Sequence, residues 1–211
     1  MELREAIYTL RSMRRVKPDP IPDEAIRAIL DAAIRAPSGS NQQHWAFLVV
    51  RDRRTKNEIG AIYRAGWQAM LDRGYGDVSR RTDLDEEARQ GLERVVGSAS
   101  YLADHIAEAP VWVFPCLRVG DRPATLTSGA SIYPAVQNLM LAARELGIGS
   151  TLTTIHKHGN DRVNELLGLP VGWDTAALIP LGYPRGKWGQ AARRPVEEVA
   201  FGERFGQPLH G

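Results

Sequence analysis

The stretch Ala36-Pro37-Ser38-Gly39-Ser40-Asn41-Gln42-Gln43-His44-Trp45-Ala46-Phe47 is the most informative part of this sequence. It joins a loop of small polar residues to the apolar run at residues 45–50, which is typical of a central strand. A glycine and short polar side chains at a strand entrance expose donors that can line the polar edge of a flat heterocycle. Taken alone, the loop is better explained as an ordinary turn.

Outward from this stretch, helices and strands mix without regular alternation. We predict five helices, at residues 3–11, from about 23 to before Pro37, from 55 to about 70, at 131–146 and at 161–167. The third begins at a capping box formed by Thr55 and Glu58. We predict further strands at 111–117, from 149 and at 176–181. This order indicates an α+β fold with a sheet covered by helices, rather than a doubly wound one.

Two segments stand apart from this pattern. Residues 72–94 hold Gly74, Gly76, many charges and few large apolar side chains, which indicates a surface helix with flexible flanks or a lid. Residues 195–211 follow the last predicted strand and have little of their own chain to pack on. We therefore expect one domain over residues 1–211, with a tail that finds its partner in a second subunit.

Composition excludes several classes of protein. The 211 residues are 43% hydrophobic and 25% charged, with a net charge of +2, so nothing demands nucleic acid or an anionic membrane. We expect no signal peptide and no membrane span, and a cytoplasmic location. The single cysteine, Cys116, lies in a predicted buried strand and is expected to be a packed thiol. His156 and His158 share a strand-like spacing, but no third metal ligand is apparent.

Basic residues near both ends form candidate phosphate sites. Arg11, Ser12 and Arg14 combine guanidinium groups with a hydroxyl, which suits a phosphate monoester. Alone, this cluster is better explained as a solvated basic helix end. Arg193 and Arg194 could join the same phosphate, or belong to a charged linker. The glycines of residues 146–154 follow a helix rather than a strand, so a dinucleotide-binding fingerprint fails on context.

In combination, these motifs resemble the nitroreductase family. The resemblance rests on residues 11–14, 36–47, 138–150 and 179–184 in that order, and covers nearly the whole chain except 72–94. It implies an α+β homodimer with a central, mostly antiparallel sheet, intertwined by a C-terminal tail that crosses to the partner. It also implies two FMN sites at the subunit interface, with NAD(P)H as reductant and a small-molecule electron acceptor.

The resemblance carries over to individual residues. Arg11, Ser12 and Arg14 match the residues that bind the flavin phosphate and reach its pyrimidine edge. The loop residues that match those bordering the flavin of the other subunit are Pro37, Ser38, Gly39 and Asn41. Leu152, Thr153 and Thr154 match the segment with backbone donors near flavin N5, in a register uncertain by one residue. Arg193, with its neighbour Arg194, matches the late phosphate contact.

The chain departs from the family pattern at His44, which replaces a usual proline, and at Val16, which replaces a usual aromatic residue. Neither change removes a cofactor-binding group. The expected activity is hydride transfer from NAD(P)H through FMN to nitroaromatics, quinones or similar electron-poor acceptors, with no obligatory catalytic side chain. A flavin-destroying enzyme, a reductive dehalogenating enzyme and a non-catalytic flavin-storage protein remain alternatives.

Overall fold

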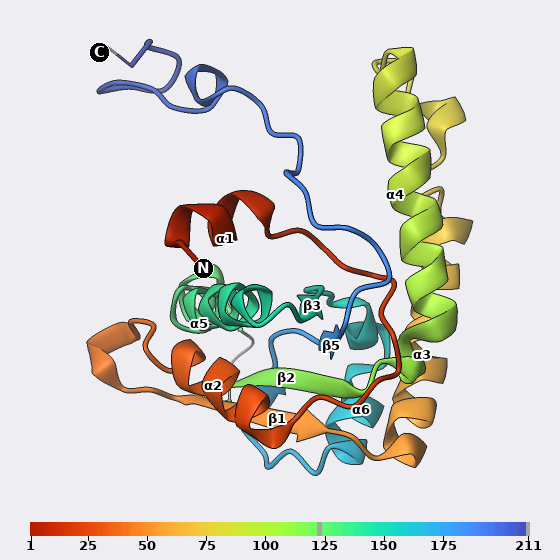
Figure 1. The fold of residues 1–211 in the computed structure, drawn as a ribbon, viewed down its shortest axis with the longest axis vertical. Helices are drawn as coiled ribbons and strands as arrows, with labels where there is room; N and C mark the ends of the chain where they lie inside the picture. Colours follow the sequence, from red (N-terminus) through yellow and green to blue (C-terminus); the bar gives the residue numbers. More distant parts are fainter. Residues whose placement is uncertain (122–123, 210–211) are drawn as a thin grey trace.

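A five-stranded antiparallel sheet forms the centre of the fold (Figure 1). The computed structural model describes residues 1–121 and 124–209. The strand order is β1-β2-β5-β3, and β4 pairs with the far half of β2. The strands are β1 (Trp45–Val50), β2 (Val111–Arg118), β3 (Gly149–Ser150), β4 (Trp173–Thr175) and β5 (Ile179–Gly182). The predicted α+β class is confirmed.

Helices cover both faces of this sheet. They are α1 (Leu3–Thr9), α2 (Asp23–Ala33), α3 (Arg53–Asp72), α4 (Glu86–His105), α5 (Leu126–Glu145) and α6 (Asn160–Leu166), with short 3-10 turns between them. In Figure 1, α1, α2 and α5 lie on one side of the molecule, while α3, α4 and α6 lie on the other. The upper parts of α3 and α4 extend beyond the sheet as a paired projection.

The alternating side chains of β2 explain the two layers. Val111, Val113 and Leu117 belong to a core with α2 and α5, whereas Trp112 and Phe114 belong to a core with α3, α4 and α6. Successive residues of a strand point to opposite faces, so a strand apolar at every position must be covered on both sides. The prediction of a buried strand here, with a packed Cys116, is confirmed. Burial raises the pKa of this thiol to about 12, so it stays protonated.

The apolar run at residues 45–50 was predicted to be a central strand, and this is wrong for the single chain. β1 pairs with β2 alone and forms an edge of the sheet. Its side chains are mostly half-buried, and Val49 is exposed. Apolar composition does not by itself distinguish an edge strand from a central one, because pairing depends on the order of strands in space.

Helix α3 begins before its predicted capping box. Asp52 is the N-cap, and its carboxylate accepts hydrogen bonds from the backbone N–H of Thr55 at 2.7 Å and from the Thr55 hydroxyl at 2.8 Å. Glu58 instead accepts from Arg54 at 3.0 Å. The assignment of Thr55 as the cap was therefore wrong, since an aspartate three residues earlier offers a charged acceptor to the same helix end.

Two further boundaries differ from the prediction. Helix α5 begins at Leu126 rather than near residue 131, because Thr125 and Ser128 form a capping box there. Within the segment 72–94, a turn and the 3-10 helix Val78–Arg80 lead into α4, whose helix continues to His105. The last nine residues of this segment, 86–94, are thus the beginning of a 20-residue helix that packs on α3.

The C-terminal segment leaves the sheet after β5 and runs past α1 to the far corner of the molecule (Figure 1). It contains the short 3-10 helix Val196–Glu198, and the side chain of Phe205 is 94% exposed. Among the described helices, none is long and apolar enough to cross a membrane.

Candidate functional site

A cavity of ≈ 240 Å³ lies between α3, α4 and the segment that follows β3. It brings together four of the predicted site residues, Arg14, Leu152, Thr153 and Thr154. Aromatic side chains of Tyr63, Trp67 and Tyr75 line its other wall, together with Met70, Ala99, Leu102, Thr151 and Ile155. An apolar, aromatic wall opposite a few polar groups is the usual composition of a small-molecule site.

Backbone contacts carry Arg14 to this cavity. The Met13 N–H donates to the Ser150 carbonyl at 2.9 Å, which places the basic segment beside β3. A Cβ at Gly149 would lie 2.8 Å from the Met13 Cβ, closer than packed atoms approach. Gly149 is therefore the residue that lets the N-terminal segment lie this close to the sheet.

Residues 15–17, which follow Arg14, are hydrogen-bonded through their backbone to residues 183–185, which follow β5. The Lys17 N–H donates to the Tyr183 carbonyl at 2.7 Å, and the Arg185 N–H donates to the Arg15 carbonyl at 2.9 Å. Val16, at the position where the family usually has an aromatic residue, forms a backbone bridge with Pro184. The direction of Arg14 is thus fixed from both sides by paired backbone.

The segment from Thr151 to Thr154 alternates between buried and exposed side chains. Thr151 and Thr153 are 1% and 8% exposed, whereas Leu152 and Thr154 are exposed. Thr151 lines the cavity, and its hydroxyl is buried and has no hydrogen-bond partner among the described residues. A buried unpaired hydroxyl is costly and uncommon, and the described residues hold four more such side-chain atoms, among them the Oγ of the neighbouring Ser150.

The charge in the cavity is positive. Arg14 is the one charged side chain among the described residues that line it. Burial raises the pKa of Tyr63, although the Thr153 hydroxyl and the Arg14 charge act in the opposite direction, so the phenol stays protonated. The cavity can therefore hold a planar ring whose edge carries partial or full negative charge.

The residues predicted to bind the phosphate do not line this cavity. Arg11 and Ser12 are exposed and directly precede the buried Met13. Arg193 lines a hollow on α1 together with Leu10, the neighbour of Arg11. Arg194 is exposed and does not line that hollow. The fold thus brings the late arginine segment to the side of the molecule where Arg11 lies.

The loop with Pro37, Ser38, Gly39 and Asn41 lies elsewhere. It precedes Trp45, which pairs with Leu117, whereas Ser150 is level with Leu181 and hence with Val111. The part of β2 from Val111 to Leu117 spans about 20 Å. Within one chain, the loop and Arg14 therefore lie toward opposite ends of the sheet, while Thr153, which pairs with Leu178, lies nearer the middle.

Local hydrogen bonds hold the loop in an open conformation. The Gly39 N–H donates to the Ser131 hydroxyl of α5 at 3.1 Å, and the Gln43 N–H donates to the Ser38 hydroxyl at 3.0 Å. Ser40, Asn41 and Gln43 all have positive φ, between 50° and 53°. Such backbone is strained for residues other than glycine and is often retained where a loop serves a ligand or a partner.

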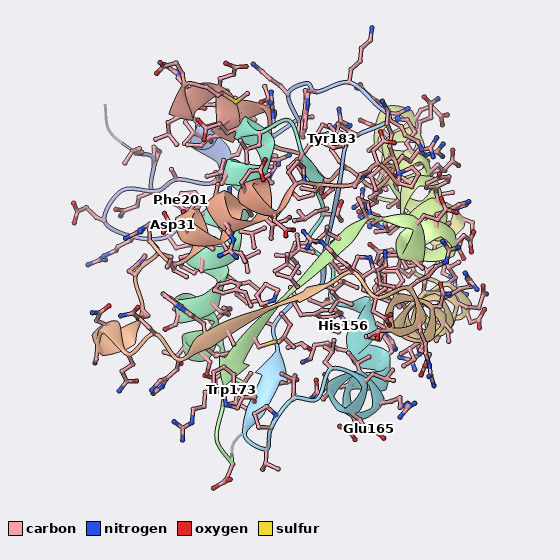
Figure 2. All side chains as sticks on the ribbon, turned by 60° about the horizontal axis from the view of Figure 1, so that its bottom comes forward. Asp31, His156, Glu165, Trp173, Tyr183 and Phe201 are labelled. Atoms are coloured by element: carbon pink, nitrogen blue, oxygen red, sulfur yellow. The ribbon has the colours of Figure 1, made fainter. Side chains whose placement is uncertain are left out.

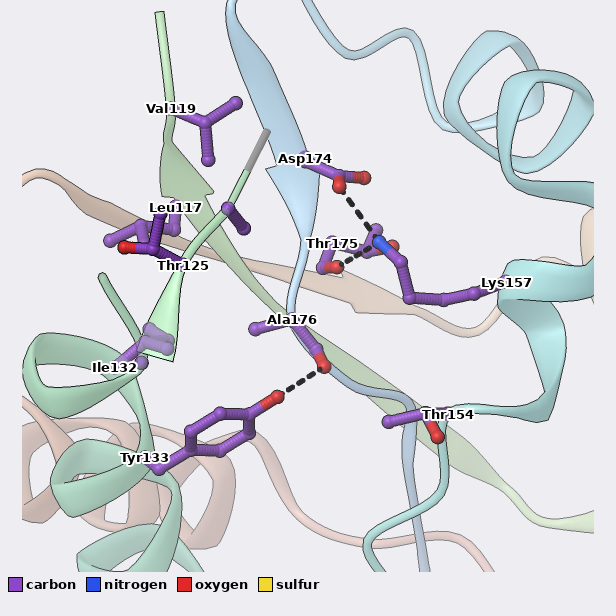
Figure 3. Close-up of a pocket in the computed structure, with 12 residues that line it drawn as sticks. Leu117, Val119, Thr125, Ile132, Tyr133, Thr154, Lys157, Asp174, Thr175 and Ala176 are labelled. Atoms are coloured by element: carbon purple, nitrogen blue, oxygen red, sulfur yellow. Dashed lines mark hydrogen bonds and ion pairs between the residues drawn. The ribbon is translucent and has the colours of Figure 1, made fainter. Parts of the chain in front are cut away.

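A second cavity, of ≈ 280 Å³, lies between the start of α5, β4 and the turn after Thr154 (Figure 3). Lys157 donates to Asp174 at 2.8 Å and to the Thr175 carbonyl at 2.7 Å, while the Tyr133 hydroxyl donates to the Ala176 carbonyl at 3.2 Å. Lys157, Asp174 and Tyr133 are thus bonded within the chain, whereas no dashed line joins the hydroxyls of Thr125 and Thr154 to the other residues drawn. This pattern holds the turn onto the sheet rather than presenting donors to a ligand.

His156 lies between the sheet and α6 (Figure 2). It is fully buried, and its Nε2 lies 2.9 Å from the Thr175 hydroxyl. Burial lowers the pKa of His156 to about 3, so the ring is neutral. The described residues contain no cluster of three His, Cys, Asp or Glu side chains able to hold a metal ion.

Sequence reasoning missed Thr151, Tyr63, Trp67 and Tyr75. Thr151 directly precedes the predicted segment, so the register uncertainty of one residue could have included it. Tyr63 and Trp67 stand four residues apart, which places them on one face of α3, but that spacing is equally typical of a helix that packs on a core. Tyr75 belongs to the segment that was expected to be a lid.

The Nitroreductase family model matches residues 7–183. An NADH dehydrogenase from Thermus thermophilus is 30% identical to this chain over 201 residues, which are 95% of this chain and 96% of that protein. The chain belongs to the nitroreductase family. Membership confirms the resemblance that the four sequence motifs indicated, and identifies the chain as a flavoprotein oxidoreductase of this family.

Solved structures share the fold of this nitroreductase-family chain. Oxidized iodotyrosine deiodinase bound to FMN and 3-iodo-L-tyrosine superposes with a TM-score of 0.74 at 23% identity, over 96% of this chain and 99% of that one. The NADPH:FMN oxidoreductase from Vibrio harveyi complexed with NAD+ gives 0.71 at 21% identity, over 99% and 79%. At these identities, the two likenesses show the fold alone.

Proposed function

We propose that this chain is an FMN-dependent oxidoreductase that transfers hydride from NAD(P)H to nitroaromatic, quinone or similar electron-poor acceptors. The observation that carries the proposal is the unpartnered, buried Thr151 hydroxyl in the cavity lined by Arg14 and three aromatic side chains. Bound FMN would supply a ring that accepts and donates hydride. The fold shared with proteins bound to FMN or named as FMN oxidoreductases supports this cofactor.

Different groups of residues would bind the ring of FMN, the polar edge of that ring and the phosphate. The aromatic wall from α3 suits a planar ring, and the Thr151 hydroxyl suits a polar ring edge. Arg14 would place a positive charge beside that edge and stabilise negative charge on it. Arg11, Ser12, Arg193 and Arg194 would bind the phosphate. The backbone of residues 152–154 would offer donors to the ring, and these would be the N–H groups of Leu152 and Thr154, because the Thr153 N–H is bonded to the Leu178 carbonyl.

We propose further that two chains complete each site. Pro37, Ser38, Gly39 and Asn41 lie at the opposite end of the sheet from Arg14, so they would border the ring held by the partner subunit of a homodimer. The exposed tail, residues 195–211, would cross to the partner, since apolar side chains such as Phe205 are otherwise left in water. Residues 1–211 would form one domain, in which residues 72–94 act as a lid.

The dehalogenating alternative is supported by the fold shared with iodotyrosine deiodinase and by sequence relatives of that name. The charge of the cavity favours the nitroreductase activity instead. No carboxylate lines it among the described residues, so the ammonium group of an amino acid substrate would lack a counter-ion from this chain. We also propose a cytoplasmic location, which suits a chain whose single thiol is buried and free.

The direct test is to purify the protein, record its visible spectrum and identify the released pigment. We expect a flavin spectrum that bleaches on mixing with NADH or NADPH under anaerobic conditions, and recovers with a quinone or nitroaromatic acceptor. A colourless protein that fails to take up FMN would contradict the proposal. A bound flavin that stays oxidised would favour storage, consumption of excess reduced FMN in air would favour the flavin-destroying activity, and turnover of 3-iodotyrosine alone would favour dehalogenation.

A further inference from the structure

Tyr63 makes a long-range hydrogen bond beneath the candidate site. Its hydroxyl lies 2.9 Å from the hydroxyl of Thr153, 90 residues later in the chain. Tyr63 is 1% exposed and Thr153 is 8% exposed, so water does not compete for this pair. The bond therefore joins the middle of α3 to the segment that lines the cavity.

Thr153 is also held through its backbone. Its N–H donates to the Leu178 carbonyl at 3.1 Å, and its carbonyl accepts from the Leu178 N–H at 2.8 Å. The backbone pair sets the position of Thr153 against the sheet, while Tyr63 holds its side chain against α3. With Thr153 facing inward, the alternation of the segment turns Leu152 and Thr154 outward.

We propose that Tyr63 is a positioning residue of the flavin site, which acts through Thr153 to fix the orientation of residues 151–154. This inference rests on the proposed function. The Tyr63 phenol lies within the wall of the same cavity as Arg14 and Thr151. A fixed segment presents its backbone donors and the Thr151 hydroxyl in one arrangement, and a preorganised set of donors binds and polarises a ring better than a mobile one.

Trp67, one turn further along α3, has a different role. Its indole N–H donates to the Ser100 hydroxyl at 3.1 Å, so it ties α3 to α4 rather than to the donor segment. Its ring also meets the Tyr75 ring edge-on, with centroids 5.5 Å apart. Tyr63 is thus the α3 residue that connects this helix to residues 151–154.

The test compares Tyr63→Phe, Thr153→Val and the double variant. We expect each single variant to weaken FMN binding to the apo-protein about tenfold, and to make the midpoint potential of the bound flavin more negative. The double variant should bind FMN within about twofold of the single variants, because both substitutions remove the same hydrogen bond. Thr153→Ser keeps the hydroxyl and should retain the wild-type affinity and potential.

Tyr101→Phe is the matched control, since it removes a phenol hydroxyl outside this cavity and should change neither quantity. A Tyr63→Phe protein with wild-type FMN affinity and potential would overturn the inference, as would additive effects in the double variant. If Tyr63→Phe does not fold, Thr153→Val and Thr153→Ser decide the matter, because equal FMN affinity in both would overturn it. A wild-type protein that takes up no FMN would overturn the proposed function, and this inference with it.

Discussion

The two polar segments proposed to border the flavin differ in how the chain holds them. Residues 151–154 are tied by backbone pairing to Leu178, which directly precedes β5, to α3 by Tyr63, and to Arg14 by a shared cavity. Residues 37–41 are mostly exposed, contact α5 through Gly39, and include backbone of positive φ. The first segment forms part of a lined cavity within one chain. The second has its conformation fixed by hydrogen bonds within its own chain, but it lies at the other end of the sheet from Arg14. A loop that borders the partner's site is expected to be arranged in this way.

The largest effect is expected at the phosphate. Arg11→Ala should weaken FMN binding about 100-fold, because paired guanidinium–phosphate hydrogen bonds are among the strongest polar contacts in proteins. Titration of apo-protein with FMN, followed by fluorescence quenching, measures this. Arg27→Ala, which removes an exposed arginine of α2, is the control and should leave the affinity unchanged. Equal affinities for the two variants would place the phosphate elsewhere.

The protein should lose stability in acid because of His156, which directly follows the segment 151–154 and Ile155 in the chain. The folded-state pKa of His156, about 3, lies below the ordinary histidine pKa of 6.5, so the unfolded chain binds a proton that the folded chain does not. This contribution is complete above pH 6.5 and is lost as the pH falls toward 3. The free energy of unfolding should decrease by about 1.4 kcal/mol per pH unit in this window.

Urea unfolding at several pH values measures this slope. His156→Gln should flatten it, whereas His44→Gln, in the exposed loop half, should leave it as in the wild type. An unchanged slope in His156→Gln would mean that other groups cause the acid sensitivity.

Removal of the unpaired Thr151 hydroxyl should have the smallest effect. It should not lower the melting temperature of the apo-protein, but it should weaken FMN binding. Thr151→Val removes a buried group that lacks a partner, so the apo-protein should keep or raise its melting temperature. FMN binding should weaken about fivefold, because the bound ring loses that hydrogen bond. Thr151→Ser restores the hydroxyl and should restore binding. Wild-type affinity in Thr151→Val would exclude this hydroxyl from the site.

Much of the fold could be predicted because its signals are local. The burial of β2 on both faces and the apolar face of α2 follow from residue patterns. The family resemblance supplied the order of the site segments. The prediction failed where the answer depends on contacts between distant residues. β1 is an edge because of strand order, and Tyr63 meets Thr153 across 90 residues. The cap of α3 was misplaced because Asp52 and Thr55 are both good helix-capping residues.

The central claim is that each site takes Arg11 from one chain and the loop of residues 37–41 from the other. It is tested most directly by mixing two variants, Arg11→Ala and Asn41→Ala, which should each bind FMN poorly as homodimers. After unfolding and refolding together at equal concentration, half of the dimers would be mixed, and one of their two sites would carry neither substitution. We predict that tight FMN binding returns to about a quarter of all sites. Tight sites that do not return on mixing, with both variants folded and dimeric, would contradict the account.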